Sequence, residues 1–331
     1  MSASSTPPLV VVWRVTEACD LGCWYCEFNR RLRRPRHTAR ADEVLAFGAL
    51  LAEYGAATGR PVLVSWLGGE PLLWPPLVEV GQTFRRAYGL RLGVTTNGTH
   101  LDSPQLLRHL AETYDQVTVS VDGPAEFHDL GRGAPGLYDR LRAAVGALRV
   151  LKARMGYGPL LRANTILMRS NVRSLEALCG SLAGWGIEEV TFNALGGAPA
   201  GPFYARERLQ PEHIDWLRAS LPGIRERLAA RGLTVRGSDR YLDRLHVAAS
   251  DGVLPVADCR PGRDFLFVDE QGRVAPCSFT AAIYGQRLAD LRSLADLFQL
   301  PDSLAERRGR EQWTPCRDCH GPQVFGKFEL A

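Results

Sequence analysis

The strongest constraint on the fold is a regular alternation of short apolar runs with longer helix-like stretches over the first 195 residues. The apolar runs, each long enough for one strand, lie at residues 8–15, 61–67, 91–96, 116–121, 160–168 and 188–194. Helix-like stretches separate them, at residues 41–55, 75–87, 103–112, 137–152 and 172–184. Six strands that alternate with helices predict parallel βα units.

Polar and apolar residues alternate along the last three of these strands. The polar positions are Thr118, Ser120, Asp122, Arg162, Asn164, Glu189, Thr191 and Asn193. A parallel strand covered by helices packs its apolar side against them. We therefore expect the polar side chains to face a solvated or ligand-filled lumen. A half-exposed antiparallel sheet would also alternate, but the regular helical insertions argue against it.

The barrel-like part is expected to end near residue 195. A Gly/Pro-rich connection follows it, a helix is expected at about residues 211–231, and the pattern from residue 232 is weak. From Cys259 we expect a separate small unit, in which a hairpin turns at Gly272 between Phe265–Val268 and Arg273–Ala275. The predicted divisions of the chain are residues 1–200, 201–258 and 259–331.

Composition and charge exclude several classes of protein. Hydrophobic residues make up 45% of the 331, which is typical of a globular protein. The formal net charge of +4 is too small to indicate a nucleic-acid partner. No apolar run approaches the length of a membrane span, and the N-terminus lacks a secretory signal pattern. We therefore expect a cytoplasmic protein with neither nucleic acid nor membrane as partner.

Seven of the eight cysteines fall into two groups. The first group is Cys19, Cys23 and Cys26, and the second is Cys259, Cys277, Cys316 and Cys319. Disulfide frameworks belong mainly to short secreted domains. In a long chain without an export signal, clustered cysteines indicate metal binding or catalysis instead.

The first group has the spacing Cys-x3-Cys-x2-Cys and directly follows the first predicted strand. Three thiolates of one loop can hold three irons of a [4Fe–4S] cube and leave the fourth iron open. A structural zinc site needs four protein ligands. The nearest further candidate is His37, which would reach the site only if the loop folded back.

This motif resembles that of the radical S-adenosylmethionine superfamily, and further segments match in the expected order. Tyr25 matches the aromatic residue that the family places against the adenine, and Gly68-Gly69-Glu70-Pro71 resembles the segment that binds the methionine amino group. The ends of the third and fourth strands, with Asn97 and Ser120, also match. The resemblance covers roughly residues 9–195. It implies an α/β fold, a partial (β/α)6 TIM-like barrel.

The same resemblance implies the chemistry. The open iron binds the methionine part of S-adenosylmethionine, the reduced cluster cleaves the cofactor, and a 5′-deoxyadenosyl radical takes hydrogen from a substrate. Glu70 is then expected to bind the methionine ammonium, and Ser120 and Asn164 the ribose or carboxylate. The expected cofactor-binding residues are Tyr25, Gly68, Gly69, Glu70, Asn97, Ser120, Asn164 and Asn193.

Three further residues are catalytic candidates. Arg162 is expected to pair with a carboxylate of cofactor or substrate, or to form a lumen salt bridge with Asp122 or Glu189. Asp122 lies at the lumen end of its strand. His128 begins a segment that resembles one found near the substrate in related enzymes, although a surface loop would explain it equally well.

The second cysteine group resembles the "twitch" domain, a short form of the SPASM extension. This implies an auxiliary [4Fe–4S] cluster held by Cys259, Cys277, Cys316 and Cys319. Four cysteines saturate a cubane, so electron transfer or structural support would be its role. A structural zinc ion with four cysteine ligands is equally compatible with the count and the spacing.

Cys179 stands alone, in a helix-like stretch where Leu175, Leu178 and Leu182 share its apolar face. The favoured interpretation is a buried core cysteine. The alternative is a hydrogen-atom donor that quenches a substrate radical, as in epimerases of the superfamily.

Residues 30–40 hold six arginines. Such a run is usually a solvated loop. It would also suit an acidic partner, such as a flavodoxin or ferredoxin that donates electrons, or a phosphorylated substrate.

Three functions compete at this point. The first is oxidation or epimerisation of a small polar molecule, such as a sugar, aminocyclitol or aminoglycoside, in natural-product biosynthesis. The second is maturation of a ribosomally made peptide. A first strand within ten residues of Met1 counts against it, because such maturases often carry an N-terminal peptide-binding domain. The third is a non-enzymatic iron–sulfur protein.

Overall fold

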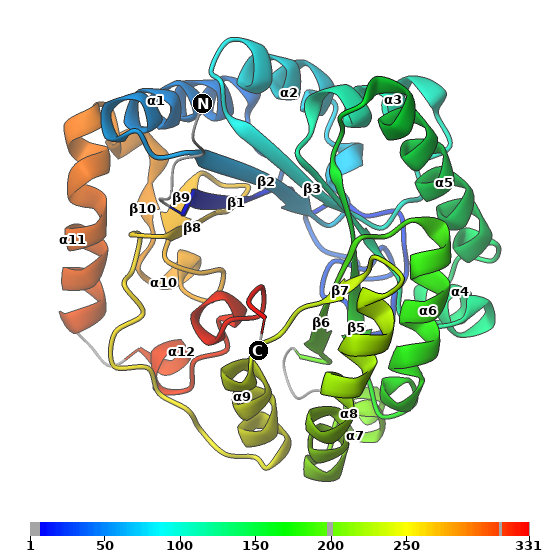
Figure 1. Ribbon diagram of the computed structural model, residues 1–331. Coiled ribbons are helices and arrows are strands. Elements are labelled where there is room, and N and C mark those ends of the chain that lie inside the picture. Colours follow the sequence, from blue (N-terminus) through cyan, green and yellow to red (C-terminus); the bar gives the residue numbers. More distant parts are fainter. Residues whose placement is uncertain (1–6, 197–200, 311–312, 331) are drawn as a thin grey trace.

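Ten strands form a single sheet that curves into an open barrel with helices around its outer side (Figure 1). The computed structural model describes residues 7–196, 201–310 and 313–330. In sheet order the strands are β10 (Gln286–Arg287), β9 (Arg273–Ala275), β8 (Phe265–Val268), β1 (Leu9–Thr16), β2 (Val62–Gly68), β3 (Arg91–Thr96), β4 (Gln116–Ser120), β5 (Leu160–Leu167), β6 (Glu189–Ala194) and β7 (Thr234–Val235). Neighbouring strands are parallel from β8 through β1 to β7, and antiparallel from β8 to β10.

The outer layer consists of helices that connect these strands and of α11, which follows the last strand. They are α1 (Ala41–Thr58), α2 (Leu77–Arg86), α3 (Pro104–Thr113), α5 (Leu137–Met155), α6 (Leu175–Trp185), α8 (Pro211–Ala229) and α11 (Leu294–Arg310). Their ends follow local chemistry. Ser103 caps α3 by accepting a hydrogen bond from the Leu106 amide, and Gly186 ends α6 in the left-handed region. Within the described part of the chain, no helix combines the length and the apolarity that a membrane crossing requires.

The expected polar row on the inner side of the barrel is present. The register pairs Ser120 with Asn164 and Asn164 with Thr191, so these residues stand at one level on three neighbouring strands. Val117, Val119 and Val121, which alternate with Ser120, are buried in the core. The barrel interior is therefore polar at the level where β4 ends.

The six predicted strands and the hairpin are confirmed, and the hairpin joins the same sheet as the six strands. β8 pairs with β1 in parallel, from Val10 opposite Phe265 to Trp13 opposite Val268. The free edge of β1 would otherwise expose unpaired backbone groups, and β8 covers it. The division of the chain near residues 200 and 258 stays a prediction.

The C-terminal segment lies inside the open side of the barrel, next to α9 (Asp239–Ala249) (Figure 1). Ser238 anchors it twice, through its amide to the Gly326 carbonyl at 3.1 Å and through its hydroxyl to the Phe325 carbonyl at 2.8 Å. The segment turns at Gly326, whose φ of 79° favours glycine. Residues at the end of the chain therefore contribute to the barrel interior.

Candidate active site

The first three cysteines lie on one loop between β1 and α1. The loop folds back on itself, because Cys26 donates its amide proton to the Cys23 carbonyl and Arg30 donates to that of Leu21. The sulfur atoms accept further hydrogen bonds: Cys26 Sγ from the Phe28 amide at 3.4 Å, and Cys19 Sγ from Asn97 Nδ2 at 3.8 Å. Such N–H···S contacts are a usual means of tuning thiolates that ligate iron.

Burial makes these thiols poor acids by themselves. It raises the pKa of Cys19 to about 12 and of Cys23 to about 11, and it raises the pKa of Cys26. A thiolate is therefore stable here only beside a cation, and thiolates are the soft ligands that iron–sulfur clusters prefer. The donor set and its amide contacts fit a cluster.

A preformed site for a single ion is absent. Among residues 7–196, 201–310 and 313–330, no three or more His, Cys, Asp or Glu side chains are gathered so as to hold a metal ion. A cubane is larger than one ion, and its cysteine ligands stand farther apart. The choice between an iron–sulfur cluster and zinc at the second cysteine group stays a prediction.

Gly68 and Gly69 let the end of β2 lie directly against the cysteine loop. Gly69 donates its amide proton to the Thr16 carbonyl and Glu70 to the Ala18 carbonyl, both at 2.7 Å. A Cβ at Gly69 would stand 2.3 Å from the Ala18 carbonyl oxygen. This distance is too short for any side chain at position 69. This pair of glycines braces the loop that carries Cys19.

Glu70 is fully buried between the ends of β2 and β3. Its carboxylate accepts hydrogen bonds from Thr96 Oγ1 and the Asn97 amide at 2.7 Å, and from the Leu72 amide at 3.1 Å. Burial raises its pKa to about 7 against these stabilising donors. In the structure Glu70 links β2 to β3 and positions Asn97, and its expected contact with a methionine ammonium stays a prediction.

Asp122 is the centre of a buried ionic network. Its carboxylate accepts a hydrogen bond from Tyr25 Oη at 2.6 Å and pairs with Arg132 at 2.8 Å. The Ile166 amide donates to its second oxygen at 2.9 Å. Burial alone would raise the pKa of Asp122, but Arg132 and the other donors lower it. The carboxylate therefore holds Tyr25 in place, and the expected catalytic role of Asp122 stays a prediction.

His128 supports Asp122. It lies in α4 (Ala125–Arg132), is fully buried, and accepts the Asp122 amide proton at Nδ1 at 3.3 Å. Burial and the neighbouring Arg132 lower the pKa of His128 to about 4, so the ring is neutral at pH 7. The expected catalytic role of His128 stays a prediction.

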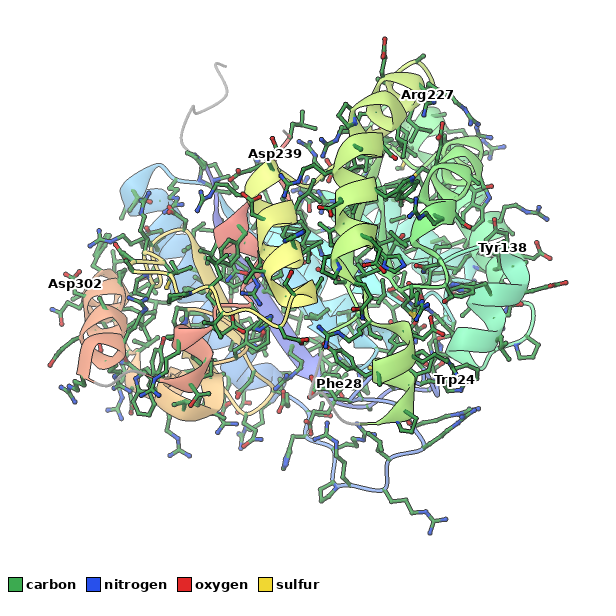
Figure 2. The ribbon with its side chains drawn as sticks, turned by 90° about the horizontal axis from the view of Figure 1, so that it is seen from below. Trp24, Phe28, Tyr138, Arg227, Asp239 and Asp302 are labelled. Atoms are coloured by element: carbon green, nitrogen blue, oxygen red, sulfur yellow. The ribbon has the colours of Figure 1, made fainter. Side chains whose placement is uncertain are left out.

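Tyr25, expected to face an adenine, packs beside Phe203 with ring centroids 6.4 Å apart. Phe203 belongs to α7 (Pro202–Glu207) and also meets Trp24, at 5.8 Å. Figure 2 shows Trp24 and Phe28 at the same edge of the molecule as α7. The structure thus adds Phe203 to the aromatic side of the site, a residue that its isolated sequence context did not indicate.

The lumen row connects the predicted cofactor residues on β5 and β6. Asn164 Oδ1 accepts hydrogen bonds from Thr191 Oγ1 at 3.1 Å, from Asn193 Nδ2 at 3.5 Å and from Lys327 Nζ at 2.8 Å. Asn193 in turn accepts one from Tyr241 Oη at 3.1 Å. Ser120 is half-buried at the same level. Contacts of these residues with a cofactor remain predictions.

Arg162 takes the salt-bridge alternative. Its Nε lies 2.5 Å from Glu189 Oε1, and Nη1 donates to Gln116 Oε1 at 3.1 Å. Both partners stand near the start of their strands, at the opposite end from the cysteine loop. In this arrangement Arg162 pairs with the protein's own carboxylate, and a pairing with a carboxylate of cofactor or substrate stays a prediction.

Cys179 is a core residue, as its apolar neighbours indicated. It is fully buried in α6, on the outer layer of the barrel, and burial raises its pKa to about 12. A thiol enclosed between a helix and the outer face of the sheet does not reach the lumen. Its burial supports the favoured interpretation of a core cysteine, and the alternative role as a hydrogen donor stays untested.

The second cysteine group assembles from three segments. Burial raises the pKa of Cys259 to about 11; Arg308 opposes this, and the other three cysteines add to it, which places all four in one electrostatic neighbourhood. Thr280 Oγ1 lies 3.4 Å from Cys277 Sγ, and Tyr284 Oη lies 3.8 Å from Cys316 Sγ. Cys319 is fixed through its amide, which donates to the Leu254 carbonyl.

Arg14 links the two cysteine-bearing regions and was not anticipated. Its Nε lies 2.5 Å from the buried Glu270 at the hairpin turn, and its guanidinium lies 5.1 Å from the Phe28 ring in the first cysteine loop. The Phe267 ring of β8 lies 5.4 Å from the same group. In the sequence, only the position of Arg14 among the alternating residues of β1 could have indicated that its side chain points inward.

Comparisons with known proteins agree with this geometry. Residues 13–158 match the family model described as the Radical SAM superfamily. An AdoMet-dependent heme synthase of Methanosarcina barkeri is 25% identical over 326 residues, which cover 94% of this chain and 89% of that protein. A PqqA peptide cyclase of Xanthomonas campestris pv. campestris is 28% identical over 331 residues, covering 95% of this chain and 79% of that protein.

Solved structures share the fold. That of Streptococcus suis SuiB bound to S-adenosylmethionine matches with a TM-score of 0.66 and 18% identity, over 98% of this chain and 73% of SuiB. SuiB bound to its precursor peptide SuiA matches with a TM-score of 0.65 and 16% identity, over 98% of this chain and 72% of SuiB. The family match and these neighbours together support the radical SAM superfamily.

Proposed function

We propose, on the premise that the chain is a radical SAM enzyme, that it modifies a peptide. The observation that carries the proposal is the 28% identity with a PqqA peptide cyclase over 95% of the chain. A sugar, aminocyclitol or aminoglycoside substrate finds no comparable support among the relatives described above. The fold shared with SuiB is compatible with a peptide in the lumen.

Each part of the site has a role in this proposal. Cys19, Cys23 and Cys26 would hold the [4Fe–4S] cluster, which together with S-adenosylmethionine supplies reductive cleavage of the cofactor when bound. Tyr25, fixed by Asp122, would position the adenine. Ser120 and Asn164 would bind the cofactor from the lumen wall. The apolar core behind β4 and β5 packs against the outer helices and holds that wall in place.

The second cysteine group would hold an auxiliary [4Fe–4S] cluster. Four cysteine ligands leave no iron open, so electron transfer or support of the hairpin would be its role. Iron and sulfide analysis of the reconstituted Cys19/Cys23/Cys26→Ala variant tests this. Retention of one cluster supports the assignment, and a protein that holds only zinc contradicts it.

Exposed arginines next to the first cysteine loop suit an acidic electron donor. Arg30, Arg31 and Arg33 are exposed, and Figure 2 shows the loop after Phe28 projecting from the molecule. Arg36 instead holds the loop, by donating to the Asn29 carbonyl at 2.7 Å. A flavodoxin or ferredoxin would dock here through charge, and its electron transfer should slow as salt rises.

The test of peptide modification uses the reconstituted enzyme, S-adenosylmethionine, a reductant and short peptides encoded beside the chain's gene. Peptides with deuterated side chains should pass deuterium to 5′-deoxyadenosine and change in mass. The Cys23→Ala variant should do neither. Should no such peptide change, while 5′-deoxyadenosine still forms, the peptide proposal is wrong and the superfamily assignment stands.

An iron porphyrin is the second candidate substrate, because the heme synthase relative aligns with 94% of the chain. Iron coproporphyrin III added to the reconstituted enzyme would reveal it. A shift of the porphyrin absorption band together with porphyrin-dependent 5′-deoxyadenosine would favour this candidate over a peptide.

A further inference from the structure

Lys327 is a buried cation inside the barrel. Only 7% of it is exposed, and its Nζ donates to Asn164 Oδ1 at 2.8 Å, at the level where Ser120, Asn164 and Thr191 line the lumen. It comes from the C-terminal segment, which Figure 1 shows within the open side of the barrel. A residue 163 positions away in sequence thus joins the predicted cofactor wall.

The segment that carries Lys327 is fixed on both sides. Ser238 bonds to Phe325 and Gly326, and Gly237 donates its amide proton to the Glu329 carbonyl at 2.9 Å. Phe328 packs under the Arg162 guanidinium at 5.4 Å. The ammonium is therefore held in place by the fold and is not the end of a loose tail.

The lumen side of the barrel carries more positive than negative charge near the start of β5 and β6. Glu189 is shared by two arginines, Arg162 at 2.5 Å and Arg236 at 2.6 Å. Lys327 has no carboxylate within ion-pair distance among the residues that the structure places. Burial and the nearby Arg162 lower the pKa of Lys327 to about 7. A pKa near 7 leaves part of Lys327 neutral at pH 7, and an anionic ligand beside Nζ would favour its charged form.

The choice of lysine is itself informative. Of the 40 basic residues only two are lysines, Lys152 and Lys327. Lys152 has an ordinary role, since its Nζ contacts both Glu188 oxygens, at 2.8 and 2.7 Å. A neutral glutamine would serve the hydrogen bond to Asn164 equally well. The compact charge of lysine at this place indicates that charge is what the site requires.

We propose that Lys327 binds a carboxylate of a molecule held in the lumen. The inference rests on the proposed function in that the lumen must receive S-adenosylmethionine and a substrate. The carboxylate belongs either to the methionine part of the cofactor or to an acidic side chain of the substrate. Both sources offer the same chemistry, and the experiment separates them.

The experiment measures acetylation rates of the two lysines in the reconstituted holoenzyme by mass spectrometry, with Lys152 as internal control. If the cofactor supplies the carboxylate, S-adenosylmethionine protects Lys327 about tenfold or more, and decarboxylated S-adenosylmethionine does not. If the substrate supplies it, these two probes act alike, and N-acetylglutamate amide protects where N-acetylglutamine amide fails. The proposal would be overturned if S-adenosylmethionine and its decarboxylated form protected Lys327 equally, and N-acetylglutamate amide and N-acetylglutamine amide did so as well.

Variants give a second readout through equilibrium binding. Lys327→Gln should weaken whichever carboxylate probe protects, by about tenfold or more, and leave its neutral counterpart unchanged. Lys152→Gln should change neither, and an unchanged cluster content shows that both variants fold. A holoenzyme that binds no S-adenosylmethionine would contradict the proposed function, while the glutamate pair still tests Lys327. If the holoenzyme binds S-adenosylmethionine and Lys327→Gln changes the binding of no carboxylate probe, this inference alone is overturned.

Discussion

At the scale of single residues, burial separates polar groups that bond only to the protein from those that stay accessible in the lumen. Asp122, His128 and Glu70 all occur at strand ends or just after them, where catalytic groups of parallel barrels gather. In the structure their hydrogen bonds are made to the protein, and Ser120 and Asn164 remain at the lumen surface.

The Asp122–Arg132 pair gives a direct test of the supporting network. Arg132→Met should destabilise the protein by about 3–5 kcal/mol, because it leaves a buried carboxylate without its partner. Adding Asp122→Asn should restore part of that loss. Arg142→Met is the matched control, since Arg142 and Asp139 form an exposed pair, and it should cost less than about 0.5 kcal/mol. Urea unfolding of the wild type and these three variants measures the losses; equal losses for Arg132→Met and Arg142→Met would contradict the network.

His128 predicts a specific dependence of stability on pH. Its pKa falls from an ordinary 6.5 to about 4 on folding, so the unfolded chain takes up a proton first as pH drops. The contribution is fully present above pH 6.5 and is lost as pH falls toward 4. Between pH 7.5 and 5 this amounts to about 2 kcal/mol.

The variant His128→Asn keeps an acceptor near the Asp122 amide but does not titrate. Urea unfolding of the reduced apoprotein at pH 7.5 and 5 should show a smaller loss for this variant than for the wild type. Identical losses would mean that His128 is already protonated in the folded state.

The sequence predicted site residues whose position depends on their own strand better than residues whose contacts lie far away in the chain. The alternation of polar and apolar residues located Ser120 and Asn164, because the direction of side chains along a strand follows from that strand alone. Lys327 and Glu270 reach the site through contacts across 163 and 256 positions, which no local pattern encodes. The sequence singles out Lys327 only in that it is a lysine in a chain whose basic residues are almost all arginines.

At the scale of elements, the cysteine loop depends on the close approach of β2. Gly69→Ala would place a Cβ 2.3 Å from one backbone oxygen and 2.6 Å from another, so the loop must move. We expect a loss of at least about 1–3 kcal/mol and a lower iron content after reconstitution. Gly146→Ala, in the middle of α5 where nothing lies within 4 Å, should stabilise by about 0.5–1 kcal/mol. A Gly69→Ala protein with full stability and iron would contradict the close contact.

Elements without a local signature are the ones that the sequence did not predict. β7 and β10 have two residues each, too few for a period. α11 contains Pro301, which locally argues against a helix, yet Leu297, Leu300 and Leu304 bury its inner face. Tertiary packing stabilises these elements, and packing between distant segments is not visible in a local pattern.

At the scale of the whole molecule, both ends of the chain build one site. β1 lies between β2 and β8, so the first cysteine loop follows a strand that the C-terminal hairpin covers. Arg14 joins that hairpin to the loop, and the last residues enter the lumen. The barrel therefore needs its C-terminal segment for both its edge and its interior.

The most direct test of the account is the formation of 5′-deoxyadenosine from S-adenosylmethionine by the anaerobically reconstituted, reduced protein. The account predicts that the wild type forms it and that the Cys19/Cys23/Cys26→Ala variant does not, while the Cys179→Ala variant matches the wild type. No product from a wild type that holds its iron, or equal product from the triple variant, would contradict the assignment of these cysteines.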